Sequence, residues 1–114
     1  MASQIIKRLI QLSEELHQLL SCDQYGNAEI QWRLEWLQRV QNALQEASSR
    51  EVLMELVQEM RQVMRGGMGA FLDIYLYPKS ECRLSETEMN ARFEQLTHEF
   101  YILREQLAKE LEEN

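Results

Sequence analysis

An apolar repeat in the last third of the chain is the feature that most constrains its fold. Between positions 89 and 111, apolar residues recur at steps of 4, 3, 4, 3, 4 and 4: Met89, Phe93, Leu96, Phe100, Leu103, Leu107 and Leu111. This spacing places them on one face of a helix. "SETE" at 85–88 is a capping-box pattern and predicts the helix start. A stripe this long must be covered, and we favour coverage by other helices of the chain over coverage by a second copy.

Two more helices are expected in the first half of the chain. One runs from Ser3, which suits an N-cap, to Leu20, and the next begins at Asn27, another N-cap residue. "SCDQYGN" at 21–27 supplies the Asp, Gly and Asn of a turn between them. Their apolar stripes are Ile5, Ile6, Leu9, Leu12, Leu16, Leu19 and Leu20, then Ile30, Leu34, Leu37, Val40 and Leu44. Trp32 and Trp36 lie one turn apart, either at the core or with one of them binding a partner.

A further helix is expected after the capping-box pattern "SSRE" at 48–51, with Ser48 as N-cap and Gly66 as its end. Its stripe is Val52, Leu53, Leu56, Met60, Val63 and Met64. Four amphipathic helices in 114 residues predict an all-α, four-helix bundle-like fold. At this length we expect one domain covering residues 1–114.

The connection before the last helix is unusual for this chain, because "GGMGAFLDIYLYP" at 66–78 holds three of the four glycines and the only proline. Gly66 and Gly67 are expected to stop the preceding helix, Gly69 to allow a second unusual turn, and Met68 to enter the core. We expect an extended segment or an irregular turn that Pro78 ends. Phe71, Ile74 and Leu76 are predicted to anchor it, with Asp73, Tyr75 and Tyr77 facing outward.

Charge and composition favour some classes of partner over others. The net charge is −7, and the acidic excess is spread along the chain. An acidic surface repels phosphate backbones, so we expect no nucleic-acid partner, whereas a basic protein would be attracted. The two cysteines, Cys22 and Cys82, stand apart and fit a reducing compartment. No signal-peptide pattern or long apolar run is present, so we expect a cytoplasmic protein without a membrane partner.

The sequence lacks recognisable catalytic or cofactor motifs. His17 and His98 have no Cys, His, Asp or Glu at a metal-ligand spacing. The "GGMG" stretch lacks the Lys-Ser/Thr of a phosphate loop and the spacing of a dinucleotide fold. We therefore expect neither an enzyme nor a bound metal or cofactor.

The glycine stretch resembles a motif of a family of small helical bacterial proteins. The family carries G-G-M-G-[small]-[aromatic]-N-D-[aliphatic] in a similar frame, and this chain matches it at Gly66, Gly67, Met68, Gly69, Ala70, Phe71 and Asp73. Leu72 departs from the pattern, which has Asn there. Many members lie near polymorphic-toxin or secretion genes, and the resemblance implies an immunity protein that neutralises a toxin.

These features together lead to a hypothesis of toxin inhibition by protein–protein interaction in interbacterial competition. The expected partner is a cognate toxin with a basic cleft, toward which carboxylates would speed association. The predicted contact residues are Asp73, Tyr75, Tyr77, Glu81, Glu86 and Glu88. The alternative is an adaptor or structural protein that self-associates through the long last helix, and both monomer and homodimer stay open.

Overall fold

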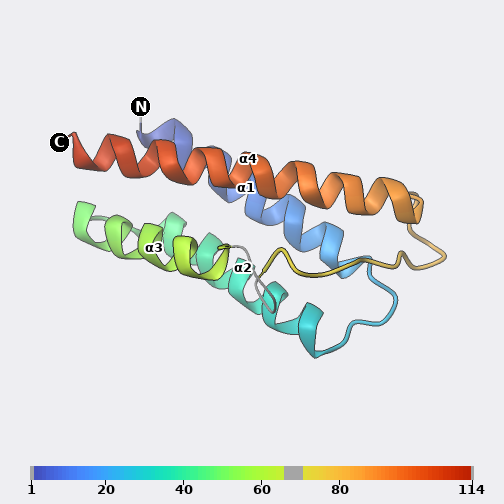
Figure 1. Ribbon diagram of the computed structural model, residues 1–114. Coiled ribbons are helices and arrows are strands. Elements are labelled where there is room, and N and C mark those ends of the chain that lie inside the picture. Colours follow the sequence, from blue (N-terminus) through green and yellow to red (C-terminus); the bar gives the residue numbers. More distant parts are fainter. Residues whose placement is uncertain (1, 66–70, 114) are drawn as a thin grey trace.

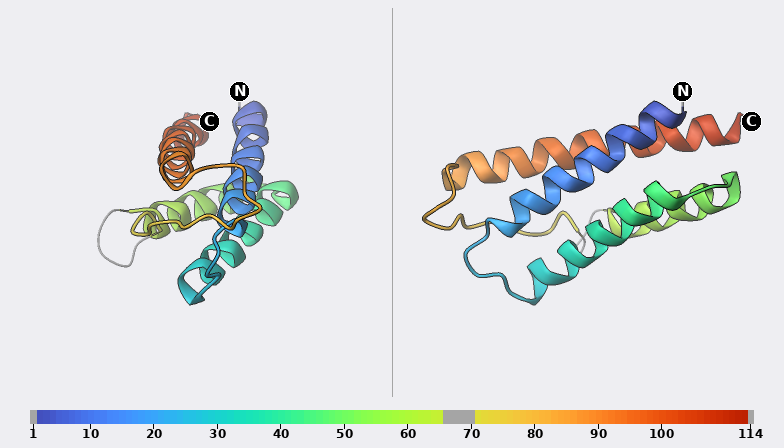
Figure 2. Two further views of the ribbon diagram at one scale, coloured as in Figure 1. Left: turned by 90° about the vertical axis from the view of Figure 1, so that its right-hand side faces the viewer. Right: turned by 180° about the vertical axis from the view of Figure 1, so that it is seen from behind.

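The computed structural model describes residues 2–65 and 71–113, and within these ranges the chain forms four helices: α1 (Ala2–Ser21), α2 (Ala28–Glu46), α3 (Arg50–Val63) and α4 (Glu86–Glu112) (Figure 1). The predicted all-α, bundle-like fold is thereby confirmed. Successive helices run in opposite directions, and the elongated body measures 47 × 26 × 21 Å. The two ends of the chain lie at one end of the body, and the 22–27 turn lies toward the other (Figure 2).

The core is built around α1, which packs most extensively against α2 and α4. Leu9, Leu12, Leu16 and Leu20 on α1 are fully buried, as their helical spacing predicts. The long stripe of α4 is also covered by the same chain. Leu103 of this stripe is half-buried. The other six members are buried: Met89, Phe93, Leu96, Phe100, Leu107 and Leu111. The preferred prediction of packing within the chain is therefore confirmed.

Two of the predicted helix starts are confirmed by their capping bonds. The Asn27 side chain accepts a hydrogen bond from the Ile30 N–H and caps α2. At α4, the Ser85 hydroxyl accepts from the Glu88 N–H at 3.1 Å, while the Glu88 carboxylate accepts from the Ser85 N–H at 2.9 Å. This reciprocal pair satisfies two amides that the helix itself leaves unpaired.

Two other predicted caps were wrong. The N-cap of α3 is Ser49, not Ser48, because the Ser49 hydroxyl accepts the Val52 N–H at 3.2 Å. Val52 therefore occupies the third helical position, so Glu51 cannot complete a capping box. Ser3 lies inside α1, which already begins at Ala2, and so does not cap it.

The end of α3 also differs from the prediction, because the helix stops at Val63 and not at Gly66. The Val63 carbonyl accepts a hydrogen bond from the Phe71 N–H at 3.3 Å, which ties the returning chain to the last turn. The predicted stripe residue Val52 is 44% exposed. The buried residues of α3 are Leu56 and Met60, which the stripe included, and Val57, which it did not. The predictions for Gly66, Gly67, Met68 and Gly69 lie outside the described residues.

The described part of the connection, residues 71–85, is irregular and extended. Its one β-bridge pairs Pro78 with Asp23 in antiparallel orientation. Beside it, the Gln24 N–H donates to the Tyr77 carbonyl at 2.8 Å, and the Lys79 N–H donates to the Cys22 carbonyl at 2.9 Å. The segment thus lies against the turn between α1 and α2, at the end of the body away from the chain termini (Figure 2).

Candidate protein-binding surface

The segment 71–77 turns Phe71, Ile74 and Leu76 inward and its polar side chains outward, as predicted. Phe71 and Leu76 are fully buried and Ile74 is half-buried, whereas Asp73, Tyr75 and Tyr77 are exposed. Leu72, which replaces the Asn of the family pattern, is 43% exposed. Near-alternation of this kind is what an extended chain produces when one side faces a core.

Phe71 anchors the start of the segment in an aromatic cluster. Its ring lies 5.3 Å from Trp36, 6.0 Å from Trp32 and 6.0 Å from Phe93, measured between ring centroids. These separations fall within the favourable range for aromatic pairs. Both tryptophans thus contact the core through Phe71, with Trp36 buried and Trp32 half-buried. Three elements, α2, α4 and the connection, meet at this one side chain.

Arg33 on α2 fixes the backbone next to Phe71. Its side chain is fully buried, and it donates to the Phe71 carbonyl at 2.8 Å and to the Glu29 carbonyl at 2.7 Å. A longer bond of 3.4 Å reaches the Asp73 carbonyl. The guanidinium also lies 4.5 Å from the centroid of the Trp32 ring, a cation–π distance. Burial lowers the pKa of Arg33, while the Glu29 carboxylate at 3.1 Å favours its charged form.

Two further side chains, those of Asn90 and Asp23, bind the backbone at the other end of the segment, at Leu76 and Tyr77. Asn90 on α4 accepts from the Leu76 N–H and donates to the Leu76 carbonyl, both at 2.8 Å, as a neighbouring strand would. Asp23 is buried and accepts the N–H groups of Tyr25, Gly26 and Tyr77. Side chains therefore supply the bonds that a sheet would otherwise provide.

These anchors bring three exposed tyrosines together at one surface, which we call the tyrosine cluster: Tyr25, Tyr75 and Tyr77. The Tyr77 ring lies 5.5 Å from that of Tyr25 and 5.2 Å from that of Tyr75, both in edge-on arrangement. Their exposed fractions are 64%, 50% and 39% for Tyr25, Tyr75 and Tyr77. Three contiguous rings at the surface form an amphipathic patch of the kind enriched in protein interfaces.

The four predicted acidic contact residues divide into two groups. Glu86 and Asp73 lie on or beside the tyrosine cluster, whereas Glu81 and Glu88 bond to residues near them in the chain. Glu86 joins the tyrosine cluster, since it accepts from the Tyr75 hydroxyl at 2.8 Å and thereby raises the pKa of Tyr75. Asp73 is exposed on the segment that carries Tyr75, and its backbone carbonyl accepts from Arg33. Glu88 is held by the backbone of its own helix cap, which lowers its pKa. Glu81 accepts from the Ser80 hydroxyl in the following turn.

Four residues of this surface or its support were not predicted from the sequence: Asp23, Tyr25, Arg33 and Asn90. Asp23 and Tyr25 lie in a stretch interpreted only as a turn, and that turn is confirmed by Gly26 with its φ of +51°. One sign of a buried arginine was available in the sequence. Position 33 holds a charged residue and lies between the stripe residues Ile30 and Leu37. Nothing in the local sequence marks Asn90 as the partner of Leu76.

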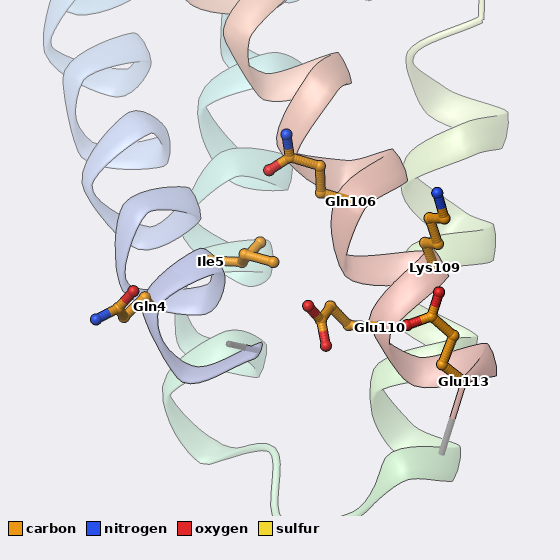
Figure 3. Close-up of a pocket in the computed structure, with 6 residues that line it drawn as sticks. All are labelled: Gln4, Ile5, Gln106, Lys109, Glu110 and Glu113. Atoms are coloured by element: carbon orange, nitrogen blue, oxygen red, sulfur yellow. The ribbon is translucent and has the colours of Figure 1, made fainter.

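The opposite end of the body carries a separate hollow between α1 and α4 (Figure 3). It is lined by Gln4, Ile5, Gln106, Lys109, Glu110 and Glu113. Its charged side chains come from Lys109 and Glu110 on α4 and from the C-cap residue Glu113. The lining includes no thiol, hydroxyl or imidazole nucleophile. In the ranges 2–65 and 71–113, no group of three His, Cys, Asp or Glu side chains could hold a metal ion. Over the same residues, no helix is long and apolar enough to cross a membrane.

Comparisons with protein-family models, with curated proteins and with solved structures found no match for this chain. The resemblance to the GGMG-containing family therefore stays a prediction, and its specific residues lie largely outside the described ranges. The function must be inferred from the tyrosine cluster and its surroundings.

Proposed function

We propose that the protein is a binding inhibitor of the immunity type, which uses the tyrosine cluster to bind and neutralise a toxin protein. The observation that carries the proposal is the exposure of three contacting tyrosine rings: Tyr75 and Tyr77 lie on a segment tied to the core by Arg33, Asp23 and Asn90, and Tyr25 lies on the adjoining turn. Tyrosines lose little entropy when they bind, and a segment ordered in advance loses still less.

Charge supports a basic partner. The chain carries a net charge of −7, and Glu86 and Asp73 lie on or beside the tyrosine cluster. Several arginines elsewhere are held in ion pairs, such as Arg8 with Glu99 and Arg61 with Glu105. A basic cleft that binds phosphate would be attracted to such a surface, and the attraction would speed association.

Self-association through α4 is the alternative function, but less of the α4 surface is available for it than the sequence suggested. The stripe from Met89 to Leu111 is covered inside the bundle. A dimer would have to use the outer face of α4, where Tyr101 and Ile102 are 52% and 41% exposed. Light scattering at micromolar concentration measures this directly, and a monomer would exclude the dimer.

The experiment that tests inhibition is co-expression with the protein encoded by the adjacent gene, with survival of the host as the readout. Protection by the unaltered chain is expected, and the triple substitution Tyr25→Ala, Tyr75→Ala, Tyr77→Ala should abolish it. If both proteins can be purified, the affinity should fall by about 10-fold or more. Survival that does not depend on the unaltered chain would contradict the proposal.

Tyr101→Ala is the matched control. Tyr101 is as exposed as Tyr75, at 52% against 50%, but it lies on α4 beside Arg104 and outside the tyrosine cluster. Protection should persist in this variant. Equal loss from Tyr101→Ala and from the triple variant would assign binding to another surface. Circular dichroism melts of all variants separate loss of binding from loss of folding.

A further inference from the structure

The two cysteines of the chain, which are far apart in sequence, lie next to each other in the fold. Cys22 follows the end of α1, and Cys82 lies shortly before α4. The Lys79 N–H donates to the Cys22 carbonyl at 2.9 Å, next to the antiparallel bridge between Asp23 and Pro78. Lys79 is therefore the residue opposite Cys22 in this short pairing.

A tight turn then brings Cys82 back to that position. The Cys82 N–H donates to the Lys79 carbonyl at 3.0 Å, which closes a four-residue turn over 79–82. The first and last Cα atoms of such a turn lie within about 7 Å of each other. The Cys82 side chain is thereby near enough to Cys22 to raise the pKa of the Cys22 thiol. Disulfide formation requires two backbones that approach to Cα separations of about 4.4–6.8 Å.

The surroundings of the pair allow a small reagent to approach. Both cysteines are half-buried. Cys22 lines a shallow open hollow together with Leu84 of the connection and residues of α1 and α4, among them Leu19 and Arg92. The Cys82 thiol and burial both raise the pKa of Cys22, so the Cys22 thiolate becomes abundant only at alkaline pH.

We propose that Cys22 and Cys82 form a reversible dithiol–disulfide site whose oxidant is a small-molecule disulfide of the glutathione class. One protein thiolate attacks the oxidant, so that a mixed disulfide forms and one small thiolate leaves. The second protein thiolate attacks the protein sulfur of the mixed disulfide and displaces the second small thiolate. Two protein thiols are thereby oxidised to one disulfide, one oxidant is reduced to two thiols, and the two protons pass to the leaving thiolates.

The bond would link the turn after α1, which carries Tyr25, to the connection that carries Tyr75 and Tyr77. It would close a loop of roughly 60 residues, and long loops give the larger stabilisation when they are cross-linked. This inference is independent of the proposed function, because it concerns only the chemistry and stability of the chain.

The test is to incubate the purified full chain with oxidised glutathione and to follow free thiols, intact mass and melting temperature. We expect both thiols to disappear, no retained glutathione, a cross-linked peptide containing Cys22 and Cys82, and a rise in melting temperature of roughly 5–15 °C. The rate should increase with pH, and dithiothreitol should reverse every change.

Cys22→Ser and Cys82→Ser serve as paired controls. Each should retain one glutathione and show no rise in melting temperature, because the second thiol is missing. Retention of glutathione on both cysteines of the unaltered chain, a disulfide between two chains, or a fall in melting temperature on cross-linking would each overturn the proposal.

Discussion

The helical body and the connection at 71–85 are held in place by different kinds of contact. In the body, α1 and α4 bury continuous apolar stripes, and their backbone bonds are satisfied within each helix. In the connection, Phe71 and Leu76 supply the apolar contacts, while Arg33, Asp23 and Asn90 bind the backbone. The comparison teaches that a segment without regular structure can be ordered by a few long-range side chains.

The largest expected effect follows from removing the apolar anchor of the connection. Phe71→Ala deletes a fully buried ring that contacts Trp32, Trp36 and Phe93. We expect the free energy of unfolding to fall by about 3–5 kcal/mol, measured by urea denaturation. Leu72→Ala is the control, because Leu72 is the next residue along the chain and is 43% exposed. This variant should change the free energy of unfolding by less than about 0.5 kcal/mol. Similar values for the two variants would mean that the connection does not share the core.

Arg33→Met is the next largest change, because it keeps the length of the side chain but removes its donors. The carbonyls of Phe71 and Glu29 would lose the guanidinium as donor, and the guanidinium is itself fully buried. We expect a loss of about 2–3 kcal/mol in the free energy of unfolding. A variant as stable as the unaltered chain would contradict the assigned role. Arg39→Met, at an exposed arginine on the same helix, should be nearly neutral.

Asn90→Ala tests the side-chain pairing at Leu76 alone. It removes an acceptor and a donor that bind the Leu76 backbone at 2.8 Å. A loss of about 1–2 kcal/mol is expected from thermal and urea melts. Asn42→Ala removes an exposed amide that accepts from the Gln38 side chain, and it should cost less than about 0.5 kcal/mol. The pairing would be of no consequence if the two alanine variants melted alike.

The smallest effect concerns the ion pairs on the helical body. Arg8 and Arg61 lower the pKa values of Glu99 and Glu105, respectively. A lowered folded-state pKa gives stability that is present above the unfolded-state value of about 4.3 and is lost as pH falls through the folded-state value. Both carboxylates are 39% exposed, so each pair should contribute less than about 1 kcal/mol.

Arg8→Gln measures the contribution of one pair. The variant should lose less stability than the unaltered chain between pH 6 and pH 3, because Glu99 then titrates nearer its ordinary pKa. Urea denaturation across this pH range gives the comparison. Parallel curves for the two proteins would show that the Arg8–Glu99 contact has no energetic role.

The body was largely predictable from the sequence because its signals are local. The steps between Met89 and Leu111 define a helix face without knowledge of what covers it. Asn27 and Ser85 could be identified as caps from nearby residues. The errors at Ser48 and Gly66 are of one to three residues, and the bond from the Phe71 N–H to the Val63 carbonyl at the end of α3 is one that local sequence does not reveal.

The candidate site was only partly predictable, because local sequence signals do not reveal contacts between distant positions. Its inward and outward residues followed from their chemical character, since Phe71 and Leu76 are apolar and Asp73 and Tyr75 are polar. The inclusion of Tyr25 depends on the pairing of Asp23 with Pro78, which joins positions more than 50 residues apart. No periodicity encodes that pairing, nor the bonds of Arg33 to Phe71 and of Asn90 to Leu76, which span 38 and 14 residues.

Amide hydrogen exchange in the native protein tests the central claim most directly, which is that side chains hold the connection in order. The Leu76 and Tyr77 amides donate to Asn90 and Asp23. We predict that both exchange slowly, with protection approaching that of α1 amides such as Leu16, and that Asn90→Ala releases Leu76 first. Exchange of Leu76 and Tyr77 at the rate of an unfolded peptide, alongside a protected α1, would contradict the account.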